Sequence, residues 1–148
     1  MDQKPTILFL CTGNACRSQM AEGWARVMLG HQFEVYSAGT APAGLDPVAV
    51  QVMAEAGVDI SSHRSKHVLD LGEKSFDYVV ILCEMAAANC PTFPASSRVL
   101  RIPVDDPVRL ARQAETPEAK LAIYRRVRDE IRHLVETLPE RLSAESTR

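Results

Sequence analysis

One short apolar run that leads straight into a polar loop constrains the fold of this chain most. Residues 6–10 (TILFL) show no alternation of apolar and polar side chains, which is typical of a strand buried on both faces of a parallel sheet. The loop at residues 11–18 (CTGNACRS) follows at once. From Ser18 to about Leu29 the pattern predicts a helix that ends at the C-cap Gly30 and buries Met20, Trp24, Val27 and Met28. A buried strand, a loop and a helix in this order predict an α/β protein.

Further strands alternate with helical patterns along the chain. Apolar segments predict strands at residues 33–38, 77–82 and 98–102. A helix is expected between the N-cap Asp46 and Gly57, since aspartate followed by proline is typical of a helix start. A final helix is expected from Thr116 to Pro139, on the apolar stripe Tyr124, Val127, Ile131, Leu134, Val135 and Leu138. We therefore expect a single domain over residues 1–148, a four-stranded parallel sheet flanked by helices on both faces, with a frayed tail over about 140–148.

Composition excludes several classes of function. The 17 Lys and Arg residues against 19 Asp and Glu give a net charge of −2, which argues against nucleic-acid binding through bulk positive charge. No apolar run approaches the roughly 18 residues that a membrane span needs, and the first residues lack the pattern of a secretory signal. We expect a cytoplasmic protein. Four cysteines are too few for a disulfide scaffold, and their spacings fit no zinc site, so catalysis or burial remains.

The loop at residues 11–18 has the composition of an anion-binding site. A loop of this length between strand and helix can wrap its N–H groups around a tetrahedral oxyanion, and the helix N-terminus adds positive charge. Gly13 lets the backbone approach closely, and Arg17 can bind two oxygens of the anion. The same donors would stabilise Cys11 as a thiolate nucleophile, to which the Ser18 hydroxyl could donate. A buried cysteine in an ordinary turn is the alternative, and Cys16 is expected to pack or to be an oxidation liability.

Two further strand ends carry reactive side chains. Cys83 follows the strand at 77–82, and if this strand neighbours the first, their spacing of about 4.8 Å permits a bond between Cys83 and Cys11. Burial of Cys83 is the alternative. A bond between Cys83 and Cys90 would require the segment between them to unwind, because seven helical steps span roughly 10 Å. After the fourth strand, either Asp105 or Asp106 could act as a general acid, and position alone leaves the choice open.

Several motifs together resemble one known family. The C-x5-R-S loop and a late Asp-Pro resemble the low-molecular-weight protein tyrosine phosphatase fold. The fuller set resembles the thioredoxin-coupled arsenate reductases over nearly the whole chain. This set consists of residues 11–24 (CTGNACRSQMAEGW), residues 35–39 (VYSAG), Cys83 with Cys90-Pro91, Asp105-Asp106-Pro107 and residues 126–131 (RVRDEI).

The resemblance implies a relay of three cysteines. Cys11 would attack arsenate, and Asp106, directly before proline, would protonate the leaving hydroxyl. Cys83 would attack Cys11 and release arsenite, and Cys90 would then form with Cys83 a disulfide that thioredoxin reduces. Phosphate or sulfate would compete with arsenate, no cofactor is implied, and a monomer is expected. The oxyanion would be held by Thr12, Gly13, Asn14, Ala15, Cys16 and Arg17.

Some members of this family bind potassium near the loop through an Asn, a Glu, a Ser and an Asp. Asn14, Glu22 and Ser37 match the first three, but Lys66 stands where the Asp would be. We expect no metal here: the Lys66 ammonium would take the place of the ion and donate hydrogen bonds to Asn14, Glu22 or Ser37. A lysine exposed on a loop is the alternative.

Two other functions compete with this interpretation. A tyrosine phosphatase would use Cys11, Arg17 and Asp106 but would need neither of the later cysteines. The chain also has Val108-Arg109 where phosphatases of this fold carry an aromatic pair. A thiol-switch protein would bind an oxyanion or a partner and change shape on oxidation without turnover, but it has no use for an acid at Asp106. The electron donor stays open between thioredoxin, glutaredoxin and a small thiol.

Overall fold

A parallel sheet forms the centre of the fold. The computed structural model describes residues 4–71, 76–82 and 97–146, with side chains as far as residue 142. Four strands pair in the order β2-β1-β3-β4, and every pair is parallel. Their carboxyl ends therefore lie at one edge of the sheet, where ligands bind in folds of this kind. The strands are β1 (Thr6–Cys11), β2 (Glu34–Gly39), β3 (Tyr78–Ile81) and β4 (Arg98–Arg101).

Strand β1 is the buried centre of this sheet. It pairs with β2 on one side and with β3 on the other, so that Leu8 lies beside both Tyr36 and Val79. Its residues 7–10 are completely buried, which explains why this strand carries no polar alternation. The predicted strands are confirmed, and each predicted end lies within one residue of the observed end.

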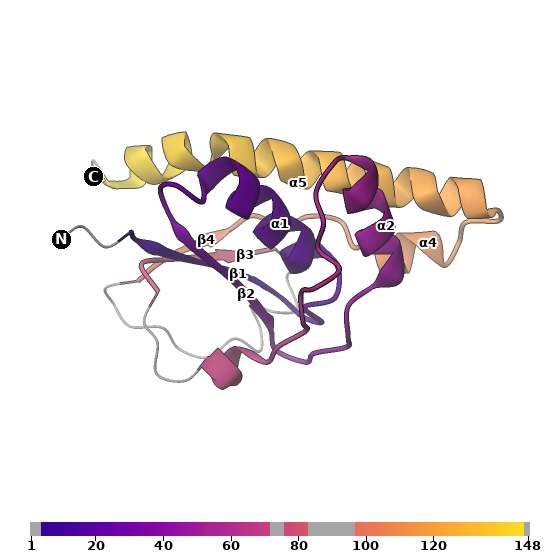
Figure 1. Ribbon diagram of the computed structural model, residues 1–148, viewed down its shortest axis with the longest axis horizontal. Helices are drawn as coiled ribbons and strands as arrows, with labels where there is room; N and C mark the ends of the chain where they lie inside the picture. Colours follow the sequence, from indigo (N-terminus) through magenta and orange to yellow (C-terminus); the bar gives the residue numbers. More distant parts are fainter. Residues whose placement is uncertain (1–3, 72–75, 83–96, 147–148) are drawn as a thin grey trace.

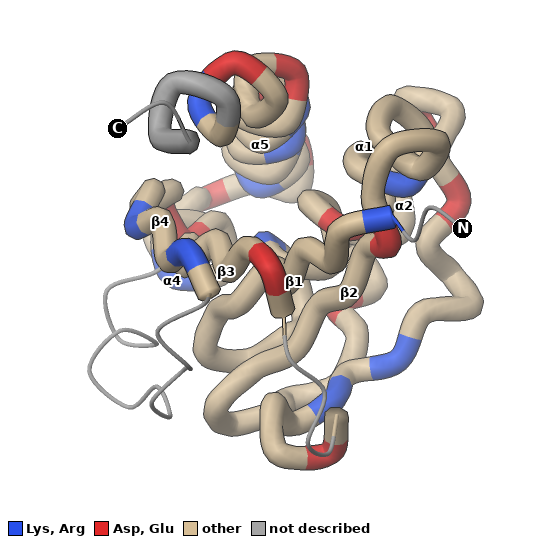
Figure 2. The backbone as a smooth tube through the Cα atoms, turned by 90° about the vertical axis from the view of Figure 1, so that its left-hand side faces the viewer, with Lys and Arg blue, Asp and Glu red and all other residues tan. Residues whose placement is uncertain are grey.

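Helices flank the sheet, as the sequence predicts. Figure 1 shows α1 (Arg17–Leu29) and α5 (Pro117–Ser146) over one face, and the 3₁₀ helix η1 (Val68–Leu71) on the opposite side. Helices α2 (Pro47–Glu55) and α4 (Pro107–Ala111) both contact α5, which also packs along α1. The end-on view in Figure 2 has the four strands side by side beneath α1 and α5. Within the described residues, no helix is both long and apolar enough to cross a membrane.

Two predicted features of the helices are wrong. Val27 is 65% exposed rather than part of the core. Gly23 lies one turn earlier on the same helix face and is buried against Met53, Val58 and Ile60, but this cover does not extend to Val27.

Helix α5 also runs past the predicted end at Pro139 and continues to Ser146. Proline removes one backbone hydrogen bond of a helix. Leu142 nevertheless follows Leu138 on the same buried face, which holds the next turn against the core. Residues 140–146, where the sequence predicts a frayed tail, are therefore helical.

Candidate active site

The predicted anion loop lies at the carboxyl edge of the sheet. Cys11 is the last residue of β1 and is paired with Gly39 of β2, and Arg17 begins α1. Both loop thiols, Cys11 and Cys16, are buried and free. The loop is thus enclosed by the sheet and by the start of the helix.

Four successive carbonyl groups of the loop are held by donors from outside it. A trans peptide directs the N–H of the next residue away from the carbonyl, and the described residues contain no cis peptide. The amides of residues 13–16 therefore point away from these donors, into the loop, where converging N–H groups can hold a tetrahedral oxyanion. The bonds are Ala41 N to Thr12 O (2.8 Å), Ala43 N to Gly13 O (2.9 Å), Gln19 Nε2 to Asn14 O (3.0 Å) and Asp46 N to Ala15 O (2.9 Å).

Asn14 maintains the sharp turn of the loop. Its φ of 47° lies in the left-handed region, which Asn tolerates better than most residues. The side chain is fully buried and bonded through both ends. Nδ2 donates to Ser18 Oγ (2.8 Å) and Ser37 Oγ (3.0 Å), and Oδ1 accepts from the Lys66 amide (2.8 Å) and Gln19 Nε2 (3.0 Å). These bonds stabilise a backbone conformation that would otherwise be strained.

Ser18 connects Asn14 to the sulfur of Cys11. Ser18 Oγ lies 2.9 Å from Cys11 Sγ. Because the same oxygen already accepts from Asn14, its hydroxyl proton is available to the sulfur. A hydroxyl that donates in this way stabilises the thiolate form, which is the nucleophile.

Arg17 and Asp106 face each other beside the loop. Arg17 Nη1 donates to Val104 O (2.9 Å), and Nη2 lies 3.8 Å from Asp106 Oδ2. Asp105 points elsewhere, with its carboxylate 3.4 Å from Arg126 on the exposed side of α5. Of the two aspartates that sequence position leaves open, Asp106 is the one beside the anion loop.

Helix α4 orients Asp106, and this helix is not among those predicted from the sequence. Asp106 is its N-cap and accepts the Val108 amide through Oδ1 (3.0 Å). Asp46-Pro47, where a helix start is predicted, is also an N-cap followed by proline. The same Asp-Pro signal at Asp106-Pro107 could therefore have found α4, although only five residues follow.

The contacts expected of Lys66 are not formed. Its Nζ donates to Arg64 O (2.9 Å), and only its backbone amide reaches Asn14. The buried carboxylate of Glu22 instead accepts from Ser37 Oγ (2.5 Å) and Arg26 Nε (2.8 Å), with His63 Nε2 at 3.7 Å. Arg26 lies one helical turn after Glu22, so it reaches the carboxylate from the same helix face. That spacing was the signal for Arg26 in the sequence.

No cluster of three or more His, Cys, Asp or Glu side chains suited to a metal occurs in the part of the chain that the structure describes. The predicted relay residues Cys83 and Cys90 lie outside the described residues. The chain that leads to Cys83 is described as far as Leu82, whose amide donates to Leu10 O (2.9 Å). Because Leu10 is paired with Ile81, residue 82 lies level with Cys11 at the end of β1.

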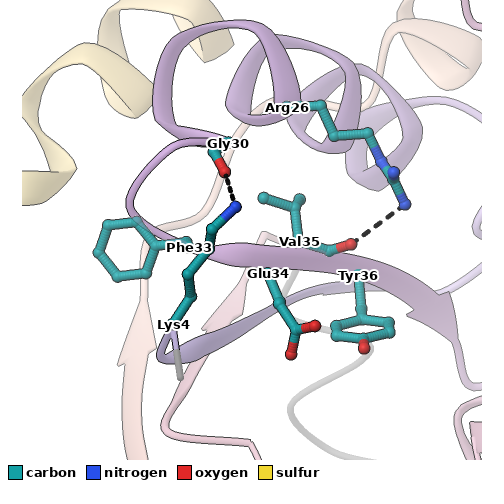
Figure 3. A pocket seen from close by; sticks show the side chains of 7 residues that line it. All are labelled: Lys4, Arg26, Gly30, Phe33, Glu34, Val35 and Tyr36. Carbon is teal, nitrogen blue, oxygen red and sulfur yellow. Dashed lines mark hydrogen bonds between the residues drawn. The ribbon is translucent and has the colours of Figure 1, made fainter. Parts of the chain in front are cut away.

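A cavity of about 340 Å³ lies away from this loop (Figure 3). Lys4 precedes β1 and Glu34 begins β2, so the cavity is at the amino end of these strands, whereas Cys11 is at the carboxyl end. The two cations that line it are already bonded to main-chain oxygens, Lys4 to Gly30 (2.7 Å) and Arg26 to Val35 (3.2 Å). The cavity is therefore separate from the candidate active site.

The chain is similar in sequence and in structure to several arsenate reductases. An arsenate reductase of Halalkalibacterium halodurans is 45% identical over 137 residues, which cover 93% of this chain and 96% of that protein. The solved structure of an arsenate reductase in the phosphate binding state has a TM-score of 0.70 and 27% identity, over 90% of this chain and 95% of the other. The thioredoxin-dependent arsenate reductase of Corynebacterium glutamicum has a TM-score of 0.65 and 28% identity, over 92% of this chain and 62% of the other.

The sequence profile of one family matches nearly the whole chain. The match covers residues 6–148, which include the anion loop, the sheet, Asp106 and α5. The chain belongs to the low molecular weight phosphotyrosine protein phosphatase family.

Proposed function

We propose that this protein reduces arsenate to arsenite, using its own cysteines and then thioredoxin as electron donors. The observation that carries the proposal is the loop between β1 and α1, in which Cys11 lies beside Ser18 and the Arg17–Asp106 pair adjoins it. A relative 45% identical over most of both chains is named arsenate reductase. A structural neighbour with bound phosphate supports the binding of a tetrahedral oxyanion.

The first step forms a covalent bond between sulfur and arsenic. Arsenate would lie among the amides of residues 13–16 and the guanidinium of Arg17. The Cys11 thiolate attacks the arsenic atom, and one arsenic–oxygen bond breaks. Asp106 gives its proton to the departing hydroxyl, which leaves as water. Arsenic remains pentavalent at this stage.

The second step transfers two electrons. The Cys83 thiolate attacks the sulfur of Cys11, and the electron pair of the sulfur–arsenic bond stays on arsenic. Trivalent arsenite leaves, and a Cys11–Cys83 disulfide remains. Leu10 is paired with Ile81, so Cys11 lies level with Leu82, the residue that directly precedes Cys83 in sequence, and this register supports the step.

The last steps restore the enzyme. The Cys90 thiolate attacks Cys83, Cys11 leaves as a thiolate, and a Cys83–Cys90 disulfide forms. Thioredoxin then reduces this bond by thiol–disulfide exchange and is itself oxidised. The naming of a structural neighbour as thioredoxin-dependent supports this choice of donor.

A single-turnover experiment tests the proposal. Pre-reduced protein is mixed with excess arsenate and no external reductant, arsenite is quantified, and the disulfide is mapped. We expect about one arsenite per chain and a Cys83–Cys90 bond. Cys90→Ser should release arsenite and stop at Cys11–Cys83, whereas Cys83→Ser should release none. Thioredoxin with its reductase should then support turnover, and glutaredoxin serves as the alternative donor.

An assay of aryl phosphate hydrolysis beside this experiment distinguishes a phosphatase from a reductase. Both activities would use Cys11, Arg17 and Asp106, and the name of the family favours the phosphatase as second candidate. Absence of arsenite together with rapid hydrolysis of an aryl phosphate would reject the reductase. In that case Cys83→Ser and Cys90→Ser should leave the hydrolysis rate unchanged.

A further inference from the structure

The segment that follows β2 supports the anion loop from outside. Residues 41–46 run alongside the loop, and we call this segment the strap. Each bond from the strap to a loop carbonyl turns the next loop amide toward the anion. The direction of the amides of residues 13, 14 and 16 therefore depends on where the strap lies. The bonds are Ala41 N to Thr12 O (2.8 Å), Ala43 N to Gly13 O (2.9 Å) and Asp46 N to Ala15 O (2.9 Å).

The side chains of the strap do little to fix its position. Residues 41–44 (APAG) are exposed, so this part buries little apolar surface against the rest of the protein. Its position therefore depends on its two ends. At the first end, β2 finishes at Gly39, whose amide donates to Lys66 O (2.8 Å). At the other end, Asp46 is the N-cap of α2.

The side chain of Asp46 ties its end of the strap to two helices. Oδ1 accepts the Val48 amide of α2 (2.9 Å), and Oδ2 accepts the hydroxyl of Tyr124 from α5 (2.7 Å). Tyr124 is only 2% exposed, so its ring is fixed in the core. Burial, followed by the hydrogen bond to Asp46, raises the pKa of Tyr124, so the hydroxyl keeps the proton that it donates.

We propose that Tyr124 and Asp46 are positioning residues for the oxyanion: their hydrogen bond fixes the strap, and the strap aims three amides of the loop at the anion. The proposal rests on the proposed function for the identity of this anion as arsenate. Cys11, Arg17 and Asp106 are held by contacts of their own. Loss of the bond should therefore weaken the binding of arsenate and leave the chemistry of bound arsenate unchanged, which is a higher KM at constant kcat.

Removal of the Tyr124 hydroxyl tests the proposal, first with inorganic phosphate, which requires no turnover. Calorimetry measures the Kd of phosphate for the pre-reduced full chain. Tyr124→Phe keeps the ring, and we expect the Kd to rise about 3- to 10-fold, the size of effect that one hydrogen bond has. In single turnovers, the arsenate concentration that gives half the maximal rate should rise by a similar factor. The rate at saturating arsenate should stay within about twofold of the wild type.

Two variants of Asp46 separate the bond from the cap and from the charge. Asp46→Ser remains a good N-cap, but its side chain is too short to reach Tyr124, so phosphate should bind as weakly as in Tyr124→Phe. Loss of a negative charge alone would strengthen the binding of an anion. In Asp46→Asn, the amide nitrogen can donate to the Tyr124 oxygen, so the Kd should return to about the wild-type value. The double variant Tyr124→Phe, Asp46→Ser should bind no more weakly than either single variant, because both remove the same bond.

Arg125 supplies the matched control for a general loosening of α2 against α5. Its guanidinium joins the same two helices, but at the other end of α2, through the two oxygens of Glu55 (2.8 and 2.9 Å). Arg125→Gln should leave the Kd of phosphate at the wild-type value. Circular dichroism checks that every variant is folded.

The outcomes separate this inference from the proposed function. An unchanged Kd in both Tyr124→Phe and Asp46→Ser overturns the inference, and so does an equal rise in Arg125→Gln. If the wild type releases no arsenite but the Kd of phosphate rises in Tyr124→Phe and Asp46→Ser alone, the proposed function fails and the inference stands. If the wild type releases arsenite and the Kd does not change in these variants, only the inference fails.

Discussion

At the scale of single residues, the side chains of the adjacent aspartates Asp105 and Asp106 point to different parts of the protein. Asp106 lies 3.8 Å from Arg17, whereas Asp105 lies beside the exposed Arg126. A general acid contributes about 10²- to 10⁴-fold. Asp106→Asn should therefore slow single-turnover arsenite release by that factor, and Asp105→Asn should leave it near the wild-type rate. Asparagine preserves the N-cap of α4, so equal losses in both variants would contradict the assignment.

The cation that neutralises Glu22 provides a second prediction at this scale. Glu22 is buried, and it is bonded to Arg26 rather than to Lys66. Arg26→Ala should lower the free energy of unfolding by about 1–3 kcal/mol, because a buried carboxylate loses a charged partner. Lys66→Ala should change it by less than about 0.5 kcal/mol. Urea denaturation measures both.

Potassium serves as the control for this assignment. Because Glu22 already has partners within the protein, replacing sodium by potassium at equal ionic strength should not change the stability of the wild type. A larger loss in Lys66→Ala than in Arg26→Ala, or a clear gain with potassium, would show that the carboxylate is neutralised in another way.

These residues indicate what the sequence could and could not predict at the site. The loop between Cys11 and Ser18 is predictable because the strand before it and the helix after it fix its direction. The partner of Glu22 is not, since Lys66 and Arg26 both have long side chains with many rotamers. The helical spacing of Glu22 and Arg26 is a local signal for this pair, whereas the prediction of Lys66 rests on the position at which some members of the resembled family carry an Asp.

At the scale of elements, the end of β2 supports the anion loop through Gly39. A Cβ atom at this position would lie 2.4 Å from Thr12 O and 2.9 Å from Asn14 N. Both are backbone atoms, so the loop itself would have to move. Gly39→Ala should cost about 1–3 kcal/mol of unfolding free energy and raise the KM for arsenate.

Gly57→Ala is the matched control for this prediction. Gly57 has a φ of 86° with open space around it, so alanine there should cost about 1 kcal/mol through backbone strain alone. The KM for arsenate should stay at the wild-type value. If the two variants raise KM equally, Gly39 has no special role in the loop.

Some ends of helices and strands cannot be predicted from local sequence patterns. The apolar runs of β1 and β3 and the Asp-Pro start of α2 are local signals, and each is confirmed. The end of α5 depends on Leu142, whose burial against the rest of the molecule outweighs the proline at 139. Local propensity alone cannot predict such a tertiary effect.

At the scale of the whole molecule, one polar network joins the loop, α1 and the segment before η1. Gln19 is fully buried; its Nε2 donates to Asn14 O and to Arg64 O, and its Oε1 lies 2.9 Å from His63 Nδ1. An amide oxygen only accepts, so the Nδ1 of His63 carries the proton that it donates. The other nitrogen of His63 faces Glu22 at 3.7 Å. The fold therefore determines the tautomer of neutral His63, which carries its proton on Nδ1.

The protonation of His63 should make stability depend on pH. Burial is the largest cause that lowers the pKa of His63, although Glu22 acts against it. The ordinary value in an unfolded chain is about 6.5. As pH falls through this value, the unfolded chain takes up a proton more readily than the folded protein, so the free energy of unfolding decreases. The stabilisation is fully present above about pH 6.5.

His63→Asn isolates this contribution, because the amide nitrogen of asparagine can replace Nδ1 as the donor to Gln19. Urea denaturation between about pH 7.5 and pH 5.5, on both sides of the ordinary histidine pKa, should show a smaller loss of stability on acidification in His63→Asn than in the wild type. His31→Asn, an exposed site, should retain the full wild-type dependence. Equal slopes in wild type and His63→Asn would mean that His63 binds its proton equally well in both states, and that the carboxylate of Glu22 fully offsets the effect of burial in the folded protein.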